Sequence, residues 1–302
     1  MLKFTKMHGI GNDYIYFDCT LGENSSGIPD SVLADDNGLS KLSVILSDRH
    51  TGIGGDGIIL ILPSTFGDFR MRIFNADGSE AKMCGNGTRC VGKFVYDHKL
   101  TDKKQVKLET LSGIKILYLH TDESNYVDTV KVDMGKAVTQ PKLIPVITEL
   151  NTENGWGLNV DIDENSYIVN AVSMGNPHGV IFVDEITDKQ VLTDGPKLEH
   201  HEMWPDRANI EFARKDDDHN LTMRVWERGS GETMSCGTGA CATAVAAVAT
   251  GLCQWPVSVK LLGGTLTIDI DPATNSILME GPATEVFNGQ MLMPDLKYVC
   301  NV

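Results

Sequence analysis

Short runs of apolar residues, bounded by Gly, Pro, Asn and Asp, dominate the hydrophobic pattern of the chain. In the first half they lie at 55–63, 69–75, 105–111 and 114–120, and in the second half at 166–172, 179–184, 208–214, 221–227, 257–262 and 265–270. Runs of this length with turn residues on either side are typical of β-strands. Because no long helical pattern separates most of them, the sequence predicts antiparallel sheets or barrels.

One central helix is predicted in each half. Residues 88–99 carry apolar side chains at helical spacing, and residues 240–251 are small and apolar on every side. The second pattern is typical of a helix buried all round, with Gly251 as its C-terminal cap. A surface helix is also expected near 38–48, whereas the turn-rich segment 139–165 is expected to be mostly irregular.

The two halves are related by an internal repeat. Residues 71–87 align with 223–239 without a gap, at an offset of 152 residues (236 − 84). A second pair of stretches, 111–117 and 262–268, agrees at an offset of 151. A period of half the chain indicates a duplicated domain rather than a solenoid. The predicted class is therefore α+β, with two pseudo-symmetric domains that are each an antiparallel β-barrel-like sheet around a central helix.

Length supports two domains, since 302 residues fit a prior of about 150 residues per domain. We expect an N-terminal half at 1–131, a C-terminal half at 132–286, and a final strand within 287–302 that packs on the N-terminal half. The net charge of −15 and the pI near 4.9 argue against a nucleic-acid partner, which requires clustered Lys and Arg.

Neither a signal peptide nor a membrane span is expected, because no apolar run has the required length. The seven cysteines are an odd number spread along a mid-sized chain, unlike the disulfide framework of a small secreted domain. The sequence therefore indicates a reduced, cytoplasmic protein.

The candidate chemistry lies in a turn that occurs twice. Cys84 and Cys236 each open a Gly-x-Gly turn directly before a predicted helix. A helix N-terminus lowers the pKa of a thiol, and its N–H groups can hold a carboxylate or the enolate formed from it. If the two halves face one amino acid, one thiolate can remove the α-proton while the opposite thiol delivers a proton to the other face. The duplication thus predicts inversion at an α-carbon, because that reaction needs an acid and a base on opposite sides.

No cofactor and no metal are expected. The stretch "GIGGDG" at 52–57 matches a dinucleotide-binding pattern, but a strand follows it where that site needs a helix. The spacing of Cys84 and Cys90 does not match structural zinc sites. Cys90 and Cys241 are interpreted as buried helix residues.

Several motifs resemble the diaminopimelate epimerase family in its order: "MHGIGNDY" (7–14), "RHTGIGGDG" (49–57), "RIFNADGSEAKMCGNGTRC" (72–90), "MGNPH" (174–178), "RANIEF" (207–212) and "ERGSGETMSCGTGAC" (227–241). They span nearly the whole chain. The resemblance implies cofactor-independent interconversion of LL- and meso-2,6-diaminopimelate, in lysine and peptidoglycan precursor biosynthesis, by a cytoplasmic homodimer. It implies a small-molecule amino-acid substrate, with no nucleic acid or membrane as partner.

The resemblance also assigns site residues by position. Cys84 and Cys236 match the catalytic thiols, and His178 and Glu227 match polar groups beside them. The positions that match substrate contacts are Asn12, Asn75, Gly85, Asn86, Asn176, Asn209, Glu227, Arg228, Gly237 and Thr238. Plainer interpretations stay open at this stage: Asn12 and Asn176 can be turn residues, and His178 an ordinary packed histidine.

Two features depart from the family pattern. Gly57 stands where many members carry Gln, and the chain has extra length within 121–168. The alternative function is a proline racemase-like enzyme with the same fold. Asn86 and Ser235 count against it, because its pattern has His at the first position and Pro at the second. A non-catalytic binding protein and a thiol-disulfide enzyme are further alternatives, the latter disfavoured by the missing Cys-x-x-Cys.

Overall fold

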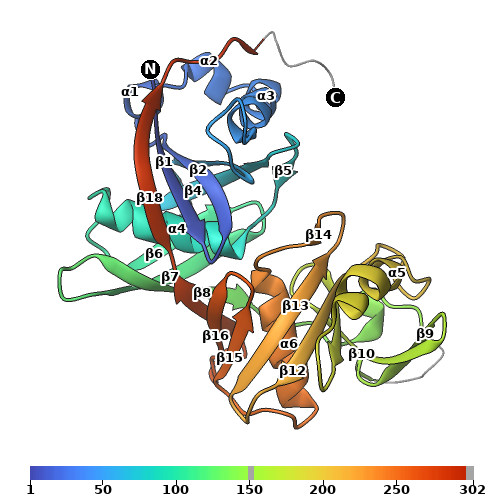
Figure 1. Ribbon diagram of the computed structural model, residues 1–302. Coiled ribbons are helices and arrows are strands. Elements are labelled where there is room, and N and C mark those ends of the chain that lie inside the picture. The colour runs from blue at the N-terminus through green and yellow to red at the C-terminus, as the bar shows by residue number, and fades with distance from the viewer. Residues whose placement is uncertain (149–152, 297–302) are drawn as a thin grey trace. The chain divides into compact units, whose positions relative to one another are not determined.

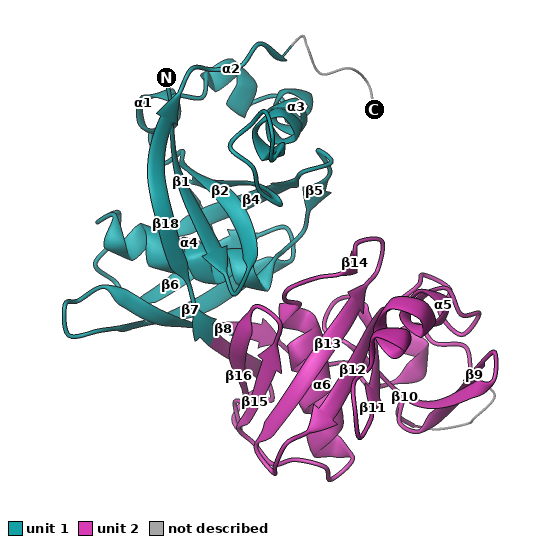
Figure 2. Cartoon of the chain, viewed as in Figure 1, with its two compact units in different colours: residues 1–132, 281–302 teal, residues 133–280 magenta. Residues whose placement is uncertain are grey.

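The computed structural model describes residues 1–148 and 153–296. The chain forms two compact units: unit 1 comprises residues 1–132 and 281–302, and unit 2 comprises residues 133–280 (Figure 2). The chain thus returns to unit 1 at residue 281, whereas the sequence analysis expects the return at 287. The last six residues of the expected terminal segment, 297–302, lie outside the described residues.

Unit 1 is a sheet with one long buried helix and smaller helices (Figure 1). Its strands are β1 (Leu2–Gly9), β2 (Asn12–Asp18), β3 (Gly57–Leu62), β4 (Phe69–Asn75), β5 (Glu80–Ala81), β6 (Gln105–Thr110), β7 (Gly113–Thr121) and β18 (Thr284–Met291), and its helices are α1 (Glu23–Ser26), α2 (Asp30–Leu33), α3 (Asp36–Ser47) and α4 (Gly85–Asp97). Strand β8 (Val127–Gly135) leads out of the unit and β17 (Ile277–Pro282) leads back.

Unit 2 repeats this plan around a second long helix. Its strands are β9 (Leu158–Ile162), β10 (Asn165–Ser173), β11 (Pro177–Phe182), β12 (Asn209–Lys215), β13 (Asn220–Glu227), β14 (Gly231–Glu232), β15 (Val257–Leu261) and β16 (Gly264–Ile270), and its helices are η1 (Pro141–Leu143), η2 (Lys189–Asp194), α5 (Gly195–Glu199) and α6 (Gly237–Ala249).

The strand pairings show the duplication directly. In unit 1 the succession β1, β2, β3, β4, β6, β7 pairs antiparallel, parallel, antiparallel, parallel and antiparallel. In unit 2 the succession β10, β11, β12, β13, β15, β16 pairs in the same order. The second half of the chain therefore repeats the topology of the first.

These pairings correct one expectation, since the sheets are mixed rather than purely antiparallel. Parallel neighbours need a long crossover connection, which usually contains a helix. Here α1 to α3 connect β2 to β3, α4 connects β4 to β6, α5 connects β11 to β12, and α6 connects β13 to β15. The sequence pattern predicted helices in three of these connections, at 38–48, 88–99 and 240–251, but not that they cross between parallel strands.

Both long helices are central to their units. Helix α4 packs against β1, β2, β7 and β18, and α6 packs against β10, β11, β12, β15 and β16. Burial along α6 is nearly continuous from Gly237 to Ala247, because its side chains are small and apolar. Gly251 follows with φ +74°, as predicted for a C-terminal cap.

The starts of the two long helices differ from the sequence expectation. Helices α4 and α6 begin at Gly85 and Gly237, directly after the cysteines, rather than at 88 and 240.

The segment 139–165, expected to be mostly irregular, contains strand β9, which pairs antiparallel with β10. Its alternation of buried and exposed residues over Leu158–Ile162 is the strand signal that the turn-rich surroundings obscured.

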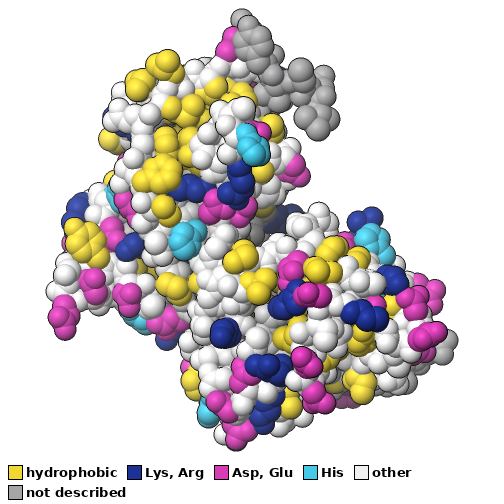
Figure 3. Space-filling view, viewed as in Figure 1, with side chains coloured by type: hydrophobic (Ala, Val, Ile, Leu, Met, Phe, Trp, Pro, Cys, Tyr) yellow, Lys and Arg dark blue, Asp and Glu magenta, His cyan; other side chains and the backbone are white. Residues whose placement is uncertain are grey.

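On one face of the molecule, acidic and basic side chains are interspersed (Figure 3). Among the helices in the described part of the chain, none is long and apolar enough to cross a membrane.

Candidate active site

In unit 1, Cys84 is the N-cap of α4. Its backbone is extended, with φ −137° and ψ 115°, and its sulfur accepts a hydrogen bond from the N–H of Gly87 at 3.4 Å. The thiol in turn donates to Oδ1 of Asn12 at 3.2 Å. The helix therefore begins on the thiol itself, which places the sulfur at the positive end of the helix dipole.

A carboxylate behind Asn12 sets the orientation of its side chain. Nδ2 of Asn12 donates to Oδ2 of Asp56 at 2.7 Å, and the N–H of Asp13 donates to the same oxygen at 3.0 Å. Arg49 binds the other oxygen of Asp56 at 2.9 Å. Because an ionised carboxylate only accepts, the amide nitrogen of Asn12 must face Asp56, and its oxygen faces Cys84. The sequence analysis did not identify Asp56, although it lies within the quoted motif 49–57.

The other predicted residues of unit 1 lie near the start of α4 or at the end of β4. Asn75 ends β4, where its Oδ1 accepts from the hydroxyl of Tyr14 at 3.4 Å and its Nδ2 donates to Ser79 at 3.0 Å. Gly85 and Asn86 form the first turn of α4. The amide oxygen of Asn86 accepts from the buried guanidinium of Arg89 at 2.9 Å, which fixes that side chain from inside the helix.

The structure explains why Gly57 departs from the family pattern. Gly57 begins β3 with φ +156°, and a Cβ placed on it would lie 2.2 Å from the carbonyl oxygen of Phe74. Real Cβ contacts are never that short, so position 57 of this chain has no room for a side chain. The residue before it, Asp56, accepts a hydrogen bond from Asn12.

In unit 2, Cys236 has the same backbone position as Cys84. It is the N-cap of α6, with φ −120° and ψ 106°, and its sulfur accepts from the N–H of Gly239 at 3.4 Å. The hydroxyl of Thr238 lies 3.5 Å from the sulfur. Gly237 and Thr238 form the first turn of α6, as Gly85 and Asn86 do in α4.

Acidic groups surround Cys236, and they overturn one expectation. Burial raises the pKa of the Cys236 thiol well above its ordinary value, and the nearby carboxyl groups of Glu227 and Glu211 raise it further. Burial also raises the pKa of Glu227, which is hydrogen-bonded to Cys236 and accepts from the hydroxyl of Thr233. The predicted lowering of the thiol pKa is wrong for Cys236, because desolvation outweighs the helix dipole.

His178 is a buried histidine with a hydrogen-bond partner at each ring nitrogen. It is fully buried on β11, with Nδ1 2.7 Å from Oε1 of Glu211 and Nε2 3.1 Å from Oδ1 of Asn176. Asn176 occupies the turn between β10 and β11, two residues before His178. The sequence analysis missed Glu211, although it lies two residues after Asn209 and therefore on the same face of β12.

A hydrogen bond joins Asn209 to Arg228, two further predicted site residues of unit 2. The side-chain oxygen of Asn209 accepts from the backbone N–H of Arg228 at 2.8 Å. The guanidinium of Arg228 donates from Nη1 to the carbonyl of Asp206 at 2.9 Å, which leaves its other N–H groups to meet an anion. Asn209 thus holds the turn that carries Arg228.

The remaining cysteines of the described chain are also free thiols. Burial raises the pKa of Cys90 to about 11 and that of Cys19 to about 12. Cys90 and Cys241 are fully buried in α4 and α6, as predicted. Among residues 1–148 and 153–296, no cluster of three or more His, Cys, Asp or Glu side chains is arranged to hold a metal ion.

The sequence matches a known family over most of its length. The family model described as diaminopimelate epimerase matches residues 4–140 and 170–286. The chain belongs to the diaminopimelate epimerase family. A diaminopimelate epimerase of Methanococcus maripaludis is 48% identical over 292 residues, covering 96% of this chain and 99% of that one. Another, from Bacteroides thetaiotaomicron, is 50% identical over 291 residues, covering 96% and 98%.

Solved structures similar to this member of the diaminopimelate epimerase family share its fold at low identity. A probable proline racemase from Agrobacterium radiobacter superposes with a TM-score of 0.67 at 14% identity, over 97% of this chain and 94% of that one. A phenazine biosynthesis protein of Bacillus anthracis gives 0.62 at 16% identity, over 97% and 99%. The predicted α+β fold with two related halves is confirmed, and identities this low show the fold alone.

Proposed function

We propose that this protein is a diaminopimelate epimerase that interconverts LL- and meso-2,6-diaminopimelate with Cys84 and Cys236 as its acid and base, without a cofactor. The observation that carries the proposal is the pair of equivalent helix starts, each with a thiol as its N-cap. The family of the chain and its relatives at 48% and 50% identity, both named diaminopimelate epimerase, support the substrate.

The reaction balances within the two thiols and the substrate. One cysteine, as the thiolate, takes the α-proton, so that the C–H bond breaks, an S–H bond forms and the electron pair moves into the carboxylate as an enolate. The opposite cysteine, as the thiol, then delivers its proton to the other face of the carbon and becomes the thiolate. The second stereoisomer leaves an enzyme whose two thiols have exchanged roles, which suits a reversible reaction.

The helix starts supply what the enolate needs. In this proposal the substrate carboxylate sits at the first turns of α4 and α6, at Gly85–Asn86 and Gly237–Thr238. The N-terminal end of a helix favours an anion, and its N–H groups are in place before charge develops. Hydrogen-bond donors aimed at such a charge typically contribute about 2.7–4 kcal/mol of transition-state stabilisation.

The distant end of the substrate needs different partners. Diaminopimelate carries a second amino-acid group, and we assign its carboxylate to Arg228, whose guanidinium forms bidentate contacts with planar carboxylates. Asn12, Asn75, Asn176 and Asn209 are assigned to the polar groups of the substrate, with Glu227 opposite an ammonium group. His178 is assigned as a polar group beside the thiol of Cys236.

The test is direct. Purified protein, reduced and free of added cofactor, is incubated with LL-diaminopimelate, and the two stereoisomers are separated and quantified. We expect the meso form to accumulate to equilibrium, and we expect no inversion of free L-proline at the same enzyme concentration. A protein that leaves LL-diaminopimelate unchanged under these conditions contradicts the proposal, and inversion of proline instead would favour the racemase alternative.

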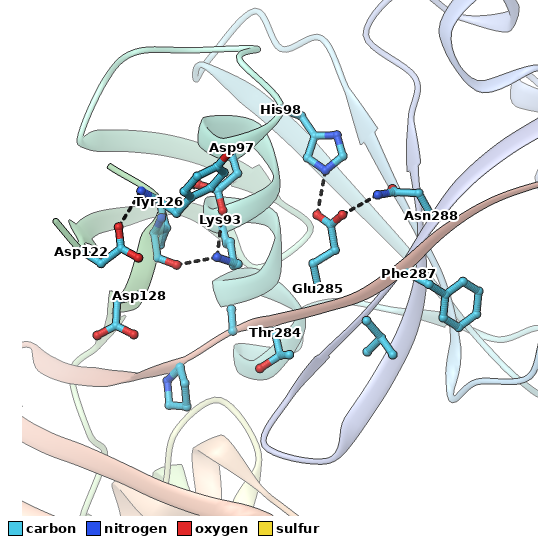
Figure 4. Close-up of a pocket in the computed structure, with 14 residues that line it drawn as sticks. Lys93, Asp97, His98, Asp122, Tyr126, Asp128, Thr284, Glu285, Phe287 and Asn288 are labelled. Atoms are coloured by element: carbon cyan, nitrogen blue, oxygen red, sulfur yellow. Dashed lines mark hydrogen bonds and ion pairs between the residues drawn. The ribbon is translucent and has the colours of Figure 1, made fainter. Parts of the chain in front are cut away.

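We also propose that the protein is a homodimer. Strand β18 pairs with β1, and it exposes apolar side chains, with Val286 53% and Phe287 47% accessible. The pocket beside it, about 730 Å³, lies between β18 and the C-terminal half of α4 (Figure 4). Exposed apolar side chains on a strand are a natural contact for a second copy. Sedimentation equilibrium should give the mass of a dimer, and Phe287→Ser should weaken the association. A protein that is a monomer at all concentrations would contradict the proposed homodimer.

A cytoplasmic location is inferred from the thiol chemistry. All six cysteines of the described residues are free. The proposed reaction needs both catalytic thiols reduced, and the cytosol maintains that state. Fractionation of the cells that express the protein should place the epimerase activity with the cytosol, and activity confined to an exported fraction would overturn the inference.

A further inference from the structure

A fully buried carboxylate lies in the middle of strand β12. Glu211 has no solvent exposure, and its sequence neighbours Ile210 and Phe212 are fully buried as well. Its Oε1 lies 2.7 Å from Nδ1 of His178, whereas Oε2 has no hydrogen-bond partner among the described residues. Acidic side chains are almost never fully buried unless they are paired, because desolvation is costly. A carboxylate held here by one histidine indicates a functional reason for its position.

The contacts of His178 determine where its protons can reside. A carboxylate only accepts hydrogen bonds, so the nitrogen that faces Glu211, Nδ1, carries a proton. The other nitrogen, Nε2, lies 3.1 Å from the side-chain amide of Asn176. An amide accepts through its oxygen and donates through its nitrogen when it turns over, so it accommodates Nε2 with or without a proton. Nδ1 is therefore tied to the carboxylate, whereas the amide beside Nε2 can pair with that nitrogen as acceptor or as donor.

The pair lies directly beside the reactive end of α6. A Cβ on Gly239 would lie 2.7 Å from Oε1 of Glu211 and 3.2 Å from the sulfur of Cys236, so glycine at this position lets the carboxylate and the thiol approach the same helix turn. The titratable groups that face Glu211 are His178 from β11, Glu227 from β13 and Cys236 at the start of α6. Of these, His178 is the hydrogen-bonding base.

We propose that Glu211 is a positioning residue that holds the Nδ1 proton of His178, so that Nε2, next to Asn176, is the nitrogen that exchanges a proton during turnover. This inference rests on the proposed epimerase function for its role in catalysis, but the tautomer itself is a property of the ligand-free protein. A neutral histidine side chain in water favours the opposite tautomer, with the proton on Nε2, so the arrangement has a distinct spectroscopic signature. A side chain that served only to fill β12 would not produce it.

The test uses ligand-free protein labelled with ¹⁵N-histidine. The chain has eight histidines, and the His178 signals are assigned by their loss in His178→Gln. Long-range ¹H–¹⁵N correlations at alkaline pH should show the proton of neutral His178 on Nδ1. In Glu211→Leu, which removes the acceptor, the proton should move to Nε2, where the oxygen of Asn176 accepts it.

One control variant and one activity measurement sharpen the result. Glu199→Leu is the matched control, because Glu199 is also a buried carboxylate of unit 2 but binds Trp226 and Gly229, and it should leave the His178 tautomer unchanged. In active enzyme, Glu211→Leu should lower kcat by roughly 10- to 100-fold, the range typical when the partner that orients a metal-bound histidine is removed.

A neutral wild-type His178 with its proton on Nε2 would overturn the proposal, as would a Glu211→Leu protein that keeps the wild-type tautomer. The wild-type spectrum alone decides the matter if the variant does not fold. Neither result depends on epimerase activity, so failure of this proposal is distinguishable from failure of the proposed function.

Discussion

Cys84 and Cys236 hold the same position in the two units. Each is the N-cap of a 13-residue helix, and each sulfur accepts from the N–H three residues further on at 3.4 Å. Their partners differ, because the thiol of Cys84 donates to the neutral amide of Asn12 whereas Cys236 is hydrogen-bonded to the carboxyl group of Glu227. The two sulfurs therefore share a backbone setting and differ in these side-chain partners.

Replacing either cysteine with serine should abolish most of the turnover. A positioned acid or base is typically worth about 10²- to 10⁴-fold in rate, and a serine hydroxyl is too weak an acid to replace a thiol in either role. Serine is among the best N-cap residues, so both helices should still form. Steady-state epimerisation by Cys84→Ser and Cys236→Ser measures the loss, and unfolding curves check the fold. Wild-type turnover in either folded variant would contradict the two-thiol assignment.

Asp56→Asn should impair the reaction through Asn12. Without the carboxylate, the amide of Asn12 is no longer forced to present its oxygen to Cys84. Asp56 is partly exposed to solvent, which screens its charge, so we expect a loss of about tenfold in kcat/KM, equivalent to about 1.4 kcal/mol. Asp122→Asn, in the loop between β7 and β8, is the control and should retain full activity. Equal effects of the two substitutions would rule out a specific role for Asp56.

Gly57→Ala should destabilise unit 1 more than Gly113→Ala does. Both glycines have positive φ, +156° and +92°, but an added Cβ at Gly113 meets nothing within 4 Å whereas one at Gly57 meets the carbonyl of Phe74. The backbone conformation alone costs about 1–2 kcal/mol, and the collision at Gly57 adds to it. Urea unfolding of the two variants isolates the steric part. Equal losses of unfolding free energy would show that position 57 does accommodate a side chain.

Much of the fold could be predicted because its signals are local. The strand-like runs and the glycine turns are short-range features, and the repeat at an offset of 152 residues requires both halves to share a topology. The parallel pairings could not be predicted this way, because they depend on the path that each connection takes between two strands. Strand β9 was missed because its alternation lies within turn-forming residues.

The site shows the same division. Motifs and the family resemblance predict Cys84, Cys236 and His178 as site residues, because thiols and imidazoles are common acid–base groups. Asp56 and Glu211 lie within quoted motifs, but their hydrogen bonds to Asn12 and His178, both at 2.7 Å, are tertiary contacts that the motifs do not reveal. The pKa of Cys236 was predicted in the wrong direction, because burial and neighbouring acids are properties of the folded chain.

Glu227 should make the stability of the protein depend on pH. Burial raises its pKa in the folded state above the ordinary value of 4.5, so the folded protein retains this proton at pH values where the unfolded chain has lost it. The contribution of Glu227 to stability is therefore complete below its unfolded pKa and is lost as pH rises through the folded pKa. The unfolding free energy of wild type minus that of Glu227→Gln should fall from pH 4 to pH 8. A difference that grows with pH would contradict the assigned direction.

The most direct test of the central claim is where deuterium first appears when LL-diaminopimelate is converted in D₂O. If Cys84 and Cys236 act on opposite faces of the α-carbon, the thiol that takes the proton is not the one that delivers the deuteron. Early in the reaction, the meso product should carry one deuterium at the inverted carbon while the recovered LL substrate stays unlabelled, as measured by NMR and mass spectrometry. Deuterium entering the recovered substrate as fast as the product, or product formed without deuterium, would contradict the account.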